Sequence, residues 1–92
     1  MESKSLDYNN LLFHLVKDFS WPNEYMFKFI VPFDVSSLNE LKALFHSKAK
    51  VSHRESKNGK YISLTALQIM ENPDEVIEIY LKAEKIKDII AL

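Results

Sequence analysis

Hydrophobic residues recur along this chain with two spacings, and each change of spacing marks the start of a new predicted element. Positions three or four apart, the period of an α-helix, recur over residues 5–18, after Ser37 and after Asn72. Alternating positions, the period of a strand, recur over residues 24–31 and again after Lys60. The pattern therefore predicts a mixed domain of helices and strands.

The predicted first helix, residues 5–18, has an apolar stripe along one side and polar residues largely elsewhere. The residues of the stripe are Tyr8, Leu11, Leu12, Leu15, Val16 and Phe19. This stripe has to be buried against another element. The helix is expected to end before Ser20-Trp21-Pro22-Asn23, a sequence that interrupts the helical period.

Two further helices are predicted from their start signals. Ser37 with Glu40 three residues later has the spacing of a capping box, so a helix is expected from there to His46 or Ser47. Asn72 is a favourable N-cap for the third helix, and the proline that follows it suits the first helical position because its missing N–H costs nothing there. The expected buried stripe of that helix is Val76, Ile77, Tyr80, Leu81 and Ala83.

The one strong turn is Asn58-Gly59, which contains the only glycine of the chain. Asn-Gly favours a type I′ turn, in which both central residues have positive φ. It therefore predicts a β-hairpin between residues 49–55 and residues 60–69. A last strand is expected over residues 85–92, which are rich in β-branched residues. Prolongation of the third helix is the alternative for that segment.

After the first helix, the predicted elements follow the order β-α-β-β-α-β. Right-handed crossovers then place the first and third strands in the middle of a four-stranded antiparallel sheet ordered 4-1-3-2, with both helices on one face. This arrangement is the ferredoxin-like plait, an α+β fold. We predict one domain over residues 1–92, with residues 1–20 as an N-terminal helical extension and residues 21–92 as the core.

Composition excludes several classes of function. A hydrophobic content of 47% is ample for one core, and 12 basic against 13 acidic residues leave no overall field to attract nucleic acid or an anionic membrane. There is no cysteine, which excludes disulfides, thiolate metal sites and cysteine catalysis. The chain has neither a signal-peptide pattern nor an apolar run of about 18 residues, so we expect a cytoplasmic protein with no membrane association.

Candidate catalytic and metal-binding residues are few. The histidines, His14, His46 and His53, lack neighbours of ligand type that would complete a metal site. The nearest approach, His14 with Asp18, is expected to be a surface polar pair. No nucleophile elbow, glycine-rich phosphate loop or pair of carboxylates flanked by apolar residues is visible. We therefore predict a non-enzymatic protein with no metal and no cofactor.

The more informative surface is the sheet face that the helices are expected to leave open. If Phe27 and Phe29 face the helices, strand alternation turns their neighbours outward. The outward residues are then Met26, Lys28, Ile30, Tyr61, Ser63, Thr65 and Leu67.

This face has three interpretations. Lys28, Ser63 and Thr65 form a candidate site for a small anion or a polar ligand. The apolar residues Met26, Ile30, Tyr61 and Leu67 form a candidate interaction surface, which the first helix or a second copy of the chain could cover. The plainer interpretation is a lysine that lays its methylenes on the sheet while its amine reaches water.

Nucleic acid has to be considered because RNA-recognition domains share this plait and stack bases on aromatic residues of their central strands. Tyr61 is the only aromatic residue expected on the open face here. The basic residues near the hairpin, Lys48, Lys50, Arg54, Lys57 and Lys60, are more simply explained as charges that prevent stray pairing of an edge strand. We therefore regard nucleic-acid binding as a less favoured function.

Several motifs resemble the YbeD-like family of small uncharacterised bacterial proteins. They are Phe27-Lys28, the hairpin Ser56-Lys57-Asn58-Gly59-Lys60-Tyr61-Ile62-Ser63-Leu64-Thr65, and Lys85-Ile86 before a short apolar end. The resemblance covers about residues 19–92. It implies a ferredoxin-like plait similar to ACT regulatory domains, in a family with no established activity.

The chain departs from that family's pattern in its added N-terminal helix and in Phe19-Ser20-Trp21-Pro22, where the family tends to have Phe and Pro adjacent. It also departs from ACT domains in the loop after the first strand. Those domains commonly place a glycine there beside their ligand, whereas this loop is Pro32-Phe33-Asp34-Val35.

Two functions are therefore open. The first is a regulatory or adaptor domain that works by contact with an unknown protein partner or by self-association. The second is a sensor domain for a small anionic metabolite or an amino acid, centred on Lys28, Ser63 and Thr65.

Overall fold

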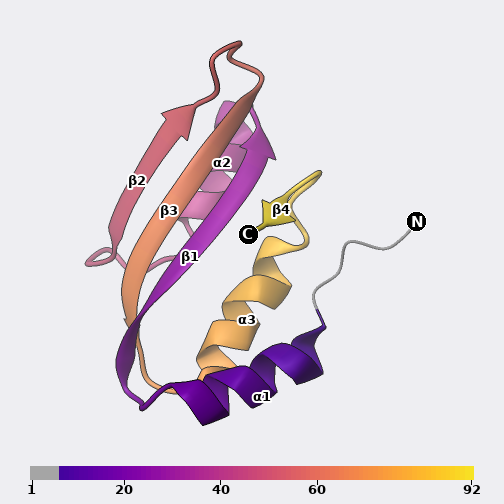
Figure 1. The fold of residues 1–92 in the computed structure, drawn as a ribbon. Coiled ribbons are helices and arrows are strands. Elements are labelled where there is room, and N and C mark those ends of the chain that lie inside the picture. Colours follow the sequence, from indigo (N-terminus) through magenta and orange to yellow (C-terminus); the bar gives the residue numbers. More distant parts are fainter. Residues whose placement is uncertain (1–6) are drawn as a thin grey trace.

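The computed structural model of this chain describes residues 7–92 and contains a four-stranded antiparallel sheet (Figure 1). The elements in chain order are α1 (Tyr8–Asp18), β1 (Asn23–Pro32), α2 (Val35–Lys42), β2 (Lys50–Glu55), β3 (Tyr61–Met70), α3 (Pro73–Ala83) and β4 (Ile90–Ala91). The strand order is β2-β3-β1-β4, which is the predicted order 4-1-3-2 counted from the other edge. The α+β class, the strand order and the leading helix are thus confirmed.

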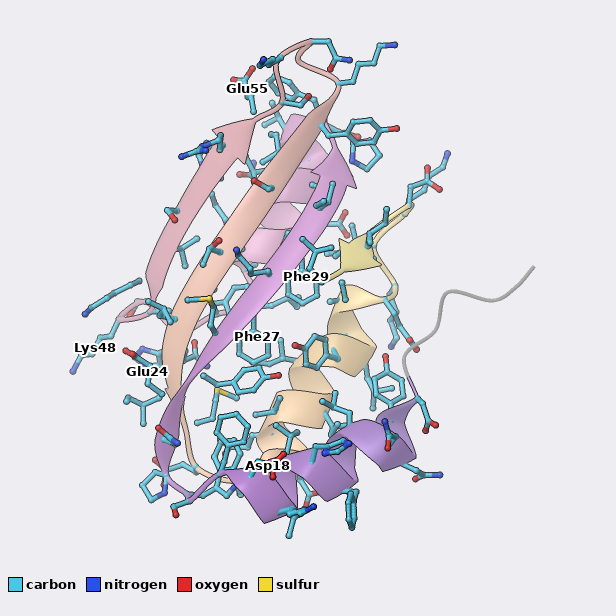
Figure 2. The ribbon with its side chains drawn as sticks, in the orientation of Figure 1. Asp18, Glu24, Phe27, Phe29, Lys48 and Glu55 are labelled. Atoms are coloured by element: carbon cyan, nitrogen blue, oxygen red, sulfur yellow. The ribbon has the colours of Figure 1, made fainter. Side chains whose placement is uncertain are left out.

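The core lies between one face of the sheet and the helices. Phe27 and Phe29 of β1, both labelled in Figure 2, are fully buried, as strand alternation predicts. The ring centre of Phe27 lies 5.4 Å from that of Phe45 and 5.3 Å from that of Tyr80. Other buried residues come from β3, α2 and α3, among them Ile62, Leu64, Ala66, Leu41, Val76 and Ala83. This packing leaves the opposite face of the sheet uncovered.

Helix α1 packs against α3 at one end of the molecule and does not cover the open sheet face (Figure 1). Leu15 is buried in the core, and the Trp21 indole N–H donates a 3.0 Å hydrogen bond to the Leu15 carbonyl. The Tyr8 hydroxyl donates a 2.7 Å hydrogen bond to the Glu84 carboxylate at the end of α3. The hypothesis that this helix is a lid over the open face is therefore wrong.

The buried stripe of α1 is narrower than predicted. The helix begins at Tyr8 with Asp7 as its N-cap, and the predicted start at Ser5 lies outside the described residues. Val16, expected in the stripe, is 61% exposed. Leu15 is the one buried residue of α1, and Tyr8, Leu11 and Leu12 are half-buried.

Helix α2 begins earlier than predicted. Asp34 is its N-cap, and the Asp34 carboxylate accepts a 2.9 Å hydrogen bond from the Ser36 N–H. Ser37 is a buried residue inside the helix. The capping-box prediction was wrong because Asp34 satisfies the free N–H groups of the first turn as well as a serine does, and it comes first in the chain. The helix also ends earlier, at Lys42.

The hairpin forms where it was predicted, but its turn is of another type. Gly59 has φ of +70°, whereas Asn58 is not among the described residues with positive φ, so the turn is not type I′. The Ser56 carbonyl accepts a 2.9 Å hydrogen bond from the Gly59 N–H, and the Asn58 side chain accepts one of 3.1 Å from the Lys60 N–H. The glycine therefore serves as the single left-handed residue that ends the turn.

The last strand is shorter than predicted. Of residues 85–92, only Ile90 and Ala91 pair with β1, opposite Ile30 and Phe29. Helix α3 ends at Ala83, so the alternative of a prolonged helix is also wrong. The intervening turns bury Ile86 against the core, and this packing overrides the local β propensity of the segment.

Candidate functional site

Adjacent strands place five polar residues side by side on the open sheet face. Lys28 of β1 lies opposite Thr65 of β3, and Thr65 lies opposite Ser52 of β2. Lys28, Thr65 and Ser52 thus form one row across the sheet. In the next row, two residues further along the strands, Ser63 of β3 lies opposite Arg54 of β2. Since the Cβ atoms of directly opposite residues are about 4.5–5.5 Å apart, side chains within each row are within reach of one another.

A shallow depression of about 470 Å³ lies over these two rows, and we call it the central hollow. Its polar side chains on the open face are Lys28, Ser52, Arg54, Ser63 and Thr65, and Leu92 closes one side. Among the residues that the structure describes, no Asp or Glu lines the hollow, and neither Lys28 nor Arg54 forms an ion pair. The central hollow is therefore a positively charged site.

The structure brings Lys28, Ser63 and Thr65, the three residues of the predicted ligand site, into this one depression. Sequence reasoning missed Ser52 and Arg54. Arg54 was placed among the charges that protect an edge strand, and only the pairing of β2 with β3 shows that its side chain shares a face with Ser63. The register of the hairpin is the signal that identifies both residues.

Apolar side chains lie on the open face on either side of the central hollow, and we call these two groups the apolar flanks. One flank consists of Met26, Leu67 and Ile69, and the other of Ile30, Tyr61, Ile90 and Leu92. Met26 is 50% exposed and Ile69 is 60% exposed, so these side chains are largely in water. All four residues of the predicted interaction surface lie in the flanks, whereas Ile69, Ile90 and Leu92 were not predicted.

A second depression, of about 490 Å³, lies near the start of β2 and the end of β3. Its charged residues have both signs and include Glu24 and Lys48, which are labelled in Figure 2. His46 contributes to it, but the His46 Nδ1 atom accepts a 3.0 Å hydrogen bond from the Lys48 N–H. The backbone N–H of His46 donates a 2.7 Å hydrogen bond to the side-chain oxygen of Gln68. These bonds make His46 a residue that holds a loop in place.

Other candidate chemistry in the chain has structural explanations. His14 and Asp18 form an exposed pair with a 3.4 Å separation, which confirms the predicted surface polar pair. Within residues 7–92, no group of three or more His, Cys, Asp or Glu side chains is placed to hold a metal ion. No helix in the same range is long and apolar enough to cross a membrane.

Two tyrosine hydroxyls are held in the protonated state. Burial, and then the hydrogen bond to Glu84 and its negative charge, raise the pKa of Tyr8 to about 12. Burial and a 3.2 Å hydrogen bond with Tyr25 raise the pKa of Tyr80 even further above its usual range. Both phenols therefore act as neutral hydrogen-bonding groups, Tyr80 in the core and Tyr8 at its edge, and neither lines the central hollow.

Comparison with known families gives one match. The family described as "Protein of unknown function (DUF493)" matches residues 17–92, which contain every element except most of α1. No curated protein and no solved structure matches the chain. The resemblance to the YbeD-like family is confirmed, because that family is DUF493. The chain belongs to the DUF493 family of proteins of unknown function.

Proposed function

We propose that this chain is a non-enzymatic regulatory or adaptor domain that binds a different protein through its open sheet face. The observation that carries the proposal is that no described element covers this face, although its apolar flanks contain Met26, Tyr61 and Ile69, each about half exposed or more. Exposed apolar patches beside polar residues often mark a site of protein contact.

The chemistry of the face favours a partner segment that is acidic and also carries apolar side chains. Lys28 and Arg54 in the central hollow would attract carboxylates, and the apolar flanks would bury apolar side chains beside them. A symmetric face-to-face pair of two copies fits less well, because the symmetry axis would bring the cations of one copy near those of the other. We therefore favour binding of a different protein over self-association.

The size of the face suits a reversible contact. β1 and β3 are ten residues long, and four strands lie side by side. β2 has six residues and β4 has two, so with about 3.3 Å per residue and about 4.8 Å between strands the face covers about 440 Å². Stable complexes bury about 800 Å² on each partner. An interface limited to this face belongs to the transient class, as expected of a regulatory contact.

The proposal extends to the fold family and the cellular setting. We propose that the core is a ferredoxin-like plait of the ACT regulatory type, acting in the bacterial cytoplasm. The strand order β2-β3-β1-β4 and the β-α-β-β-α-β order of the core support the ferredoxin-like plait. An amino-acid ligand, as in some ACT domains, is not favoured at the central hollow, because the ligand's ammonium group would meet no carboxylate among the described lining residues.

The test is affinity capture from a native lysate with three forms of the full chain. These are the unchanged protein, Ile69→Asp on the open face, and Leu81→Asp on the exposed side of α3 as a matched control. We expect the unchanged protein and the control to retain one protein in stoichiometric amount, and Ile69→Asp to lose it. The proposal fails if the unchanged protein captures no stoichiometric partner, or if Ile69→Asp retains the partner equally well. Circular dichroism confirms that all three forms are folded.

A further inference from the structure

We infer that the central hollow is a binding site for a phosphate group. The inference goes beyond the proposed protein contact, because a phosphate group could bind there with or without a partner protein. It depends on the juxtaposition of Lys28 and Arg54 across β3, with hydroxyl groups between them.

Lys28 and Arg54 approach the hollow from opposite sides. They are separated by two strand spacings and by two residues along the strands, so their Cα atoms are about 12 Å apart. Both side chains are long, and the two charged groups can converge over the strand between them. Ser63 and Thr65 of that strand present their hydroxyls to the same space, and Ser52 is next to Thr65 on β2.

These groups match a phosphate better than a carboxylate. A phosphate monoester carries a charge of about −1.5 to −2 and three strong acceptor oxygens, whereas a carboxylate carries one charge and two oxygens. Two cations and three hydroxyls supply the charge and the donors that the phosphate requires. The planar guanidinium of arginine can donate two parallel hydrogen bonds to a phosphate, as it can to a carboxylate, so the preference for phosphate comes from the number of cations and hydroxyls.

No described acidic residue neutralises this site. Glu55 follows Arg54 in the chain, but it lies opposite the buried residue Ile62 and therefore belongs to the other face of the sheet. Glu24, the acidic residue of β1, lines the second depression and not the central hollow. The positive charges of Lys28 and Arg54 are thus not matched by any described Asp or Glu side chain in the hollow.

The volume of about 470 Å³ leaves room for more than the phosphate group. It allows a small phosphoester or the phosphorylated side chain of a protein, and the two share the same recognition chemistry. The apolar flanks would add contacts only to the phosphorylated protein.

The experiment measures binding of inorganic phosphate to the full chain by backbone amide chemical shifts, at constant ionic strength. In the unchanged protein we expect saturable shifts centred on Ser52, Ser63 and Thr65. Lys28→Gln and Arg54→Gln should each weaken binding about tenfold or more, since each loses a charge-assisted contact. Lys82→Gln, with the same charge change on an exposed part of α3, should bind within about twofold of the unchanged protein. The inference is overturned if no saturable shifts are seen, or if the Lys28 and Arg54 variants bind phosphate as tightly as the unchanged protein.

Further titrations identify which anion the hollow prefers and whether the phosphate group belongs to a small molecule or to a protein. Acetate should bind about tenfold more weakly than phosphate, and equal binding of the two would overturn the assignment to phosphate. Equal affinity for glycerol phosphate, which has no ammonium group, and for a phosphoserine peptide with apolar flanks supports a free phosphoester, whereas tighter binding of the peptide supports a phosphorylated protein. Ile69→Asp should keep its affinity for inorganic phosphate, so failure of the proposed protein contact is distinguishable from failure of this site.

Discussion

At the scale of single residues, strand alternation separates structural side chains from those available for binding. Phe27 and Phe29 of β1 are fully buried, while Lys28 between them is exposed in the central hollow. This difference follows from sequence alone, because adjacent residues of a strand point to opposite faces. Arg54 could not be recognised in the same way, since its role depends on which residue of β3 it pairs with.

Tyr8 provides a test of how α1 is attached. The pKa of this phenol is raised from 10 to about 12 by burial and by Glu84, so the folded state favours the protonated form. Its contribution to stability is therefore complete below pH 10, the unfolded value, and is lost as the pH rises from 10 to about 12. We expect Tyr8→Phe to lower the free energy of unfolding by about 0.5–1 kcal/mol at pH 8. The difference from the unchanged protein should shrink above pH 10.

Urea unfolding at several pH values measures this effect. Tyr61→Phe serves as the control, because the Tyr61 hydroxyl has no hydrogen-bond partner among the described residues. The account of α1 docking is contradicted if Tyr8→Phe has no effect at pH 8, or if its effect is the same at pH 8 and above pH 11.

At the scale of elements, the existence and order of the helices and strands were predictable, but their ends were not. Hydrophobic periodicity located α1, β1, α2, β3 and α3, because it reflects which side of each faces the core. The strand β2 was located from the Asn58-Gly59 turn and β4 from its β-branched residues. The start of α2 depended on a choice between Asp34 and Ser37, two residues with similar capping ability. The length of β4 depended on the packing of Ile86, which is a tertiary contact. As a result, the contribution of Ile90 and Leu92 to the open face was not predictable.

The N-cap of α2 can be tested directly by two alanine substitutions. Asp34→Ala should lower the free energy of unfolding by about 1 kcal/mol, because the Ser36 N–H loses its acceptor. Ser37→Ala should change it by less than about 0.5 kcal/mol, because alanine favours a helix interior. Urea unfolding of both variants provides the comparison. If Ser37→Ala were the more destabilising substitution, the capping box at Ser37 would be correct, and the start of α2 at Val35 would be wrong.

At the scale of the whole molecule, one face of the sheet packs against the helices and the other face is left open. α1 adds to the helical side, where Leu15 joins the core and Trp21 hydrogen-bonds to its carbonyl, and it leaves the opposite face free. Sequence reasoning could not decide between a lid and an added helix, because an apolar stripe shows that a helix is buried but not against what. The family match covers residues 17–92, so the open face belongs to the part shared with the family and most of α1 does not.

The most direct measurement is site-specific photo-crosslinking in growing bacterial cells that express the full chain. A photo-reactive residue would replace Ile69 on the open face in one form and Leu81 on α3 in the other, both of which are exposed positions. The account predicts a discrete crosslinked product with a different protein from position 69 and none from position 81. No product from position 69, a product of twice the chain's mass, or the same product from both positions would contradict the claim that the open sheet face binds a protein partner.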